Sequence, residues 1–107
     1  MARIDTAEGQ VILPLPAEHA WTKAFEAFER VGIVEERRLE EQRIVGIVPS
    51  GFGGMNGAHV EVQVLAAGDA AADVKVQASA QEGLIKQKTA PKAVEKFLNE
   101  LSSAGGN

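Results

Sequence analysis

Two segments in the second half of the chain alternate strictly between apolar and polar residues, and this alternation constrains the fold more than any other feature. Every second position is valine or alanine: Val60, Val62, Val64, Val74, Val76, Ala78 and Ala80. The intervening residues are polar: Glu61, Gln63, Lys75, Gln77 and Ser79. Because successive side chains of a strand point to opposite faces, each segment predicts a strand with one buried and one solvated face, as in an antiparallel sheet. Gly68 and Asp69 favour a turn between the two strands.

The first half of the chain predicts three further strands. The first has alternating apolar residues, with an extension back to Ile4 left open, and Pro14 favours an edge position or the end of that strand. The other two flank the polar segment 39–42, whose length suits a hairpin loop, and the charge run 35–41 predicts a solvated hairpin tip. These strands span residues 11–15, 33–38 and 43–48.

Two other segments carry apolar residues at the three- and four-residue spacing of an amphipathic helix. The first begins at Ala17, and Gly32 after it supplies the left-handed stop that often ends a helix. Its apolar positions are Ala20, Trp21, Ala24, Phe25, Phe28 and Val31. The second has Thr89 as its cap and Pro91 in its first turn. Its apolar positions are Ala90, Ala93, Val94, Phe97, Leu98 and Leu101.

The order of these elements is β-α-β-β-β-β-α, which predicts the α+β fold class. We expect a two-layer domain, in which a curved antiparallel sheet carries both helices on one face. A chain of 107 residues suits one hydrophobic core. We therefore predict a single domain over residues 1–101 and a flexible, glycine-containing tail over residues 102–107.

The succession of elements over residues 10 to 101 resembles small uncharacterised bacterial domains of helix-grip type. The resemblance rests on the helix from Ala20-Trp21 to Phe28, the strand start Ile44-Val45-Gly46, the glycine loop, the valine strands and the closing helix Ala93-Val94-Glu95-Lys96-Phe97-Leu98. In such domains one long helix is held by an antiparallel sheet. The resemblance implies binding of apolar ligands or a role in assemblies. The lipid-binding members carry extra helices between the first two strands, which are missing from this chain, so we do not expect a large ligand cavity.

The composition excludes several chemistries. Without cysteine, the chain has no disulfides, thiolate metal sites or cysteine nucleophiles. The two histidines, His19 and His59, are not spaced with carboxylates as metal ligands, and no catalytic triad or perturbed carboxylate pair is evident. We therefore expect no catalytic residues, metal or cofactor, and no enzymatic activity. The net charge of -4 argues against nucleic-acid binding. The chain start lacks a signal-peptide core and no stretch suits a membrane span, so we expect a cytoplasmic protein.

The glycine loop 51–57 is the most unusual segment. It does not match the dinucleotide-binding pattern, because Asn56 replaces the third glycine and a strand follows. Large apolar side chains in such a loop are costly to expose unless something covers them. Our leading hypothesis is therefore a non-enzymatic binding or assembly module that contacts a protein partner or a second copy of itself. The predicted contact residues are Phe52, Gly53, Gly54 and Met55. Loop composition by itself favours a plain flexible connection, and a third alternative is that Phe52 and Met55 fold back over the end of the sheet.

The sequence leaves two further sites open. The alternative function is a carrier of a small apolar ligand, with a pocket between the sheet and the Trp21, Phe25 and Phe28 side of the first helix, although such a stripe also suits plain core. The second candidate is a weak anion site near the start of the last helix. Several lysines lie there, and the free N–H groups of a helix N-terminus favour anions. Its residues are Lys86, Lys88, Thr89 and Lys92, and ordinary solvated lysines are the competing interpretation.

Overall fold

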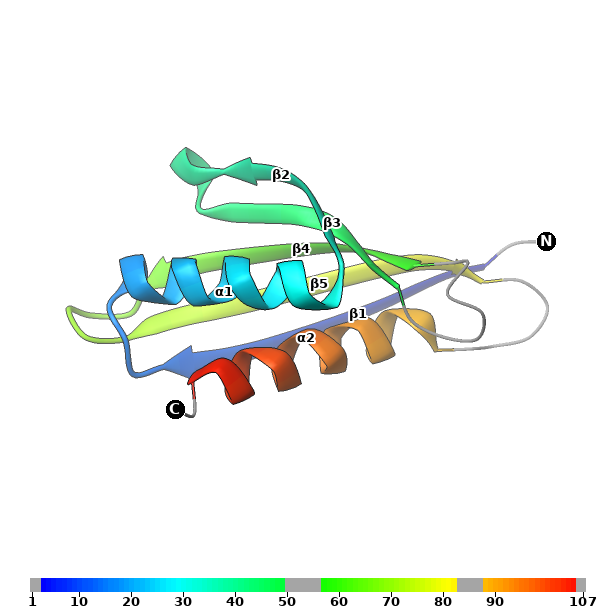
Figure 1. The fold of residues 1–107 in the computed structure, drawn as a ribbon. Helices are drawn as coiled ribbons and strands as arrows, with labels where there is room; N and C mark the ends of the chain where they lie inside the picture. Colours follow the sequence, from blue (N-terminus) through cyan, green and yellow to red (C-terminus); the bar gives the residue numbers. More distant parts are fainter. Residues whose placement is uncertain (1–2, 50–56, 83–87, 106–107) are drawn as a thin grey trace.

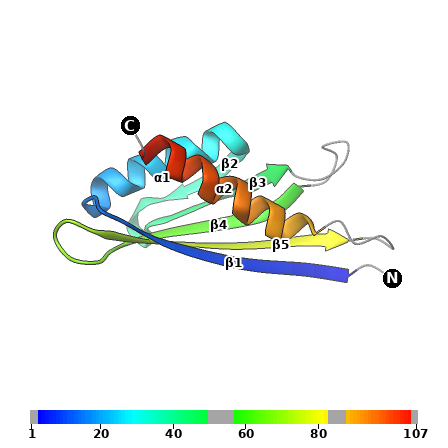
Figure 2. The same cartoon turned by 90° about the horizontal axis from the view of Figure 1, so that it is seen from below.

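The sheet is the organising layer of the domain. In the computed structural model, which describes residues 3–49, 57–82 and 88–105, five antiparallel strands carry two helices on one face, as Figure 1 and Figure 2 show. The elements are β1 (Arg3–Leu13), α1 (Ala17–Val31), β2 (Ile33–Arg38), the short 3-10 helix η1 (Leu39–Glu41), β3 (Arg43–Pro49), β4 (Gly57–Ala66), β5 (Ala72–Glu82) and α2 (Thr89–Gly105). The predicted α+β architecture and the order of its elements are confirmed.

The two valine-rich strands lie at the centre of the sheet, as their alternation predicts. The strand order is β1-β5-β4-β3-β2. Val62 pairs with Val76 and Val64 with Val74, and all four side chains are buried on the helix side. The first strand pairs with the last, so β1 and β2 form the two edges of the sheet.

The helices meet each other as well as the sheet. The rings of Phe28 on α1 and Phe97 on α2 pack edge to face, with 5.9 Å between their centroids and 60° between their planes. At the surface, Arg30 Nη1 lies 3.5 Å from Glu100 Oε2 and joins the same two helices. On its buried face α1 carries small residues, namely the fully buried Ala20, Ala24 and Ala27. Because small residues permit close approach, α1 lies close to the sheet.

The structure corrects two predicted boundaries and settles one that was open. The first strand ends at Leu13, before Pro14, and has the backward extension that the sequence left open, reaching Arg3. Helix α2 continues through Ser102 to Gly105, so residues 102–105 belong to a helix and not to a flexible tail. Residues 106–107 lie outside the described residues. The periodic apolar pattern ends at Leu101, and a helix with polar side chains beyond it leaves no such signal.

Gly32 does not end α1 in the predicted left-handed conformation. Its backbone is extended, with φ -166° and ψ -157°, while its N–H donates to the Phe28 carbonyl oxygen. A Cβ atom at this position would lie 2.2 Å from the Ile47 carbonyl oxygen. The glycine is therefore required by the close approach of β3 and not by backbone handedness.

An irregularity in β2 decides which side chains face the helices. Val34 pairs with Gly46 and is partly buried against the core, but the pairing register shifts between Val34 and Glu36. Simple alternation from Val34 would turn Glu36 inward and Arg37 outward. The extra residue inverts this phase, so Arg37 pairs with the buried Ile44 and faces the helix layer.

Candidate functional site

A cleft opens where the start of α1 faces the tip of the β2–β3 hairpin and the end of β4. Its volume is about 190 Å³. It is lined by Ala17, Glu18, Trp21, Leu39, Gln42 and Val64. We call this site the Trp21 cleft. Its walls are mainly apolar, and Glu18 and Gln42 supply the polar groups.

The hairpin tip holds its shape through backbone geometry. Gln42 has a positive φ of 59°, donates its N–H to the Leu39 carbonyl oxygen and accepts a hydrogen bond at its own carbonyl from the Val64 N–H. This tie to β4 holds the tip over the start of α1. Leu39 nevertheless remains 68% exposed, although it is a large apolar residue on the rim of the cleft.

The three predicted pocket residues have different positions. Trp21 is half-buried and lines the cleft. Phe25, one turn further along α1, is also half-buried and is covered by the Arg37 guanidinium, which lies 4.7 Å from the ring centroid. Phe28 is fully buried against Phe97 and is not among the residues that line the cleft.

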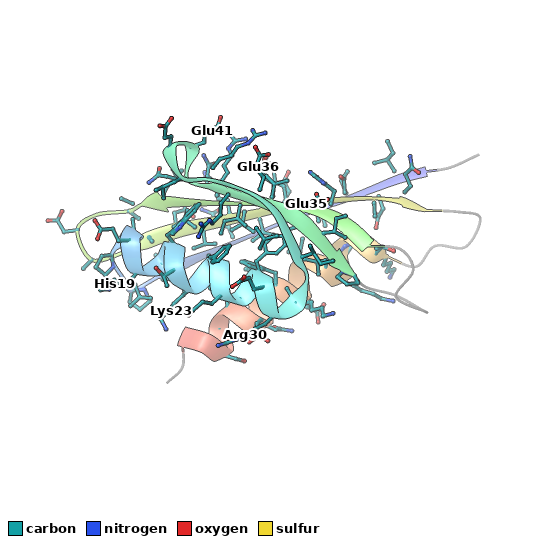
Figure 3. All side chains as sticks on the ribbon, turned by 45° about the horizontal axis from the view of Figure 1, so that its top comes forward. His19, Lys23, Arg30, Glu35, Glu36 and Glu41 are labelled. Carbon is teal, nitrogen blue, oxygen red and sulfur yellow. The ribbon has the colours of Figure 1, made fainter. Side chains whose placement is uncertain are left out.

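The charged side chains of the hairpin tip lie on two different faces of the sheet. Arg38 pairs with Glu36 at 2.8 Å and with Glu41 at 3.3 Å. Glu36 and Glu41 project outward in Figure 3. The hydrogen bond from Arg38 lowers the pKa of Glu36, and the bond to Glu36 raises the pKa of Arg38. This part of the run forms a solvated tip, whereas Arg37 turns inward over Phe25.

Sequence reasoning missed Arg37, Leu39 and Val64 as neighbours of the site. The alternation of β4 places Val64 on the buried face, but it does not indicate that a hairpin tip stands opposite. For Arg37 the sequence offers no signal, because a bulge in β2 has no consistent residue pattern.

At the predicted anion site, the carboxylate of Asp5 already accepts a hydrogen bond from the start of α2. The Ala90 N–H in the first turn of α2 donates to Asp5 Oδ2 at 3.3 Å. Thr89 is buried, while Lys88 and Lys92 are exposed. Lys86 lies outside the described residues. Asp5 therefore occupies part of the helix terminus at which we expected an external anion.

The predicted partner-binding residues Phe52, Gly53, Gly54 and Met55 lie outside the described residues, so assembly through the glycine loop stays a hypothesis. The two histidines are on different layers: His19 is exposed on α1, and His59 is on the outward face of β4. Among the described residues, no cluster of histidine, cysteine and acidic side chains suits a metal ion. None of the helices in that part of the chain is long and apolar enough to cross a membrane.

Two other hollows have a different character. One, of about 370 Å³, lies on the outward face of the sheet and is lined mainly by polar side chains such as Thr6, Glu61 and Gln77. The other, of about 320 Å³, runs between β1 and α2 over Val94 and Leu98. Neither is lined by tryptophan, phenylalanine or tyrosine, whereas Trp21 forms a wall of the smaller cleft.

No family model and no curated protein sequence matches the chain. Solved structures match it along nearly its full length. A START superfamily protein from Mycobacterium smegmatis has a TM-score of 0.56 at 12% identity, covering 94% of this chain and 93% of that one. The Zhui aromatase/cyclase from Streptomyces sp. R1128 has a TM-score of 0.57 at 10% identity, and the match covers 97% of this chain and 93% of that one. A protein from Thermobifida fusca has a TM-score of 0.61 at 17% identity, and the match covers 94% of this chain and 93% of that one. The predicted helix-grip fold is confirmed.

Proposed function

We propose that this protein is a non-enzymatic carrier of a small apolar ligand, which it binds in the Trp21 cleft. One observation carries the proposal: an apolar cleft between helix and sheet has Trp21 as a wall and leaves Leu39 largely exposed on its rim. Apolar surface next to a concave site is the usual mark of a ligand pocket. This favours the carrier over the protein-contact module that the glycine loop suggested.

The size of the cleft limits the ligand. Its volume of about 190 Å³ is close to that of engineered apolar cavities, roughly 150 Å³, which bind benzene. The buried alanines of α1 hold the helix against the sheet and leave little room for the ligand to extend beneath it. We therefore propose a single-ring or short aliphatic compound as the ligand, and not a long-chain lipid.

The fold is compatible with this function but does not specify it. One structural neighbour is named an aromatase/cyclase and another a START superfamily protein. A shared fold at low sequence identity leaves function to be argued from the site. The non-enzymatic part of the proposal rests on the sequence, which offers no nucleophile, base and orienting group in one pattern.

Tryptophan fluorescence tests the proposal directly, because Trp21 is the only tryptophan in the chain. We expect a saturable change in emission on titration with neutral compounds from toluene to hexylbenzene, and calorimetry should give the same dissociation constants. Leu39→Ser should weaken binding, since it removes an apolar side chain from the rim. The matched control is Ile12→Ser, which changes a 54% exposed isoleucine on β1 and should leave binding unchanged.

Two results would contradict the proposal. The first is the absence of binding across the whole neutral series by both methods. The second is an equal loss of affinity in Leu39→Ser and Ile12→Ser, which would place binding away from the cleft.

A further inference from the structure

One arginine of the hairpin faces the same side of the sheet as the cleft. The bulge in β2 turns Arg37 toward the helix layer, and its guanidinium lies 4.7 Å from the centre of the Phe25 ring. Phe25 and Trp21 are one turn apart on α1, about 6 Å along the helix axis. Arg37 therefore stands about one helical turn from the wall of the Trp21 cleft.

This guanidinium is not engaged by an acidic side chain of the described residues. Of the four glutamates of the hairpin, Glu36 and Glu41 pair with Arg38, and neither Glu35 nor Glu40 forms a salt bridge with Arg37. On the next strands Glu61 pairs with Arg43 at 3.3 Å. The Arg37 guanidinium lies over the Phe25 ring in a cation–π contact, and because a guanidinium carries five N–H donors, donors remain for a carboxylate.

Resting on the function proposed above, we propose that the ligand is an apolar carboxylic acid, with its hydrocarbon end in the Trp21 cleft and its carboxylate on Arg37. Arginine presents parallel N–H groups that match the two oxygens of a carboxylate. The opposite orientation is unfavourable, because Glu18 lines the cleft and already supplies negative charge at the start of α1. Arg37 is thus assigned as the residue that selects the charge of the ligand.

Three compounds with one hydrocarbon body test this assignment: phenylbutyrate, phenylbutanol and phenylbutylamine. With the wild-type chain, we expect phenylbutyrate to bind about tenfold more tightly than phenylbutanol, as a charge-assisted hydrogen bond at an exposed site allows. This preference should fall as salt is added, because exposed charges are screened. Trp21 fluorescence and calorimetry give the dissociation constants.

Variants locate the effect. Arg37→Gln should reduce the affinity for phenylbutyrate to that for phenylbutanol and leave the affinity for the alcohol unchanged. Arg37→Lys should retain part of the preference, because it keeps the charge. The matched control is Arg38→Gln, which changes the adjacent arginine on the outward face and should leave both affinities unchanged.

The ligand series in the wild-type chain decides the question even if a variant does not fold. Equal affinities for the acid and the alcohol would overturn the role of Arg37 and leave the carrier function standing. Tightest binding of the amine would overturn it as well, since Glu18 would then select the charge. A lack of binding by the neutral alcohol and by both charged compounds would instead overturn the proposed function.

Discussion

The two helices meet the same face of the sheet in different ways. On one side, α2 packs on β1 and β5 in what we call the α2 seam, formed by Gly9, Val94, Phe97 and Leu98. A Cβ atom at Gly9 would lie 2.7 Å from Val94 Cγ1 and 2.8 Å from Leu98 Cδ1, so the missing side chain lets the helix sit on the strand. On the other side, the start of α1 and the hairpin tip leave the Trp21 cleft between them, with Leu39 exposed.

The difference shows that apolar side chains between the sheet and the helices can stabilise the fold in one region and remain available to a ligand in another. In the α2 seam Val94 and Phe97 are buried and Leu98 is partly buried beside the hollow between β1 and α2, so most of this burial already contributes to the free energy of folding. Around the Trp21 cleft, similar side chains remain partly in water, and their burial is still available to a ligand. If this division is correct, substitutions in the α2 seam should reduce stability far more than substitutions around the Trp21 cleft.

The largest effect is expected in the α2 seam. Phe97 is fully buried and packs against Phe28, so Phe97→Ala should lower the free energy of unfolding by about 3–5 kcal/mol. Leu39→Ala at the cleft rim should lower it by less than about 0.5 kcal/mol, because the side chain is exposed. Urea unfolding of both variants measures the two values. Similar losses in the two variants would mean that the hairpin tip belongs to the core.

An intermediate effect is expected at the start of α2. Asp5 accepts a hydrogen bond from the Ala90 N–H, so Asp5→Ala should lower the free energy of unfolding by about 1 kcal/mol, as loss of a helix cap does. The control Glu8→Ala changes an exposed carboxylate on the same strand and should stay within about 0.5 kcal/mol. Thermal or urea unfolding distinguishes them.

The same variant tests the predicted anion site. If phosphate occupies the start of α2 beside Lys88 and Lys92, then adding it should raise the unfolding midpoint of Asp5→Ala more than that of the wild type. Equal responses in the two proteins would exclude an anion site at this helix terminus.

The smallest effect is expected at the hairpin tip. The hydrogen bond from Arg38 lowers the pKa of Glu36 in the folded state. The pair therefore stabilises the folded state fully at pH values above the ordinary glutamate pKa. This stabilisation is lost as the pH falls through the lowered pKa of Glu36. Glu36 is exposed, so the change in stability should be near the limit of detection. An NMR titration should show that Arg38→Gln raises the pKa of Glu36, whereas Arg43→Gln leaves it unchanged. An unchanged titration in Arg38→Gln would mean that the pair does not persist in solution.

Much of the fold is predictable from local periodicity. The alternation around Val62 and Val76 identifies the central strands, and the spacing from Ala20 to Val31 identifies α1. The element boundaries are less accessible: β1 extends to Arg3 and α2 to Gly105 through segments without a clear apolar pattern. Of the candidate site, Trp21 is found from the sequence, because a large aromatic at the start of an amphipathic helix must face the sheet or its margin.

The periods in the amino-acid sequence specify which neighbours along the chain share a face: residues two apart lie on one face of a strand, and residues three or four apart lie on one face of a helix. Which distant residues come into contact follows from the packing of the folded chain. One inserted residue in β2 moves Arg37 from the outward face of the sheet to the face that carries Phe25. Pairing of the first strand with the last brings Asp5 to Ala90, which lies 85 positions further along the chain. Such contacts depend on register and on packing between layers, and neither is encoded in the period of a single segment.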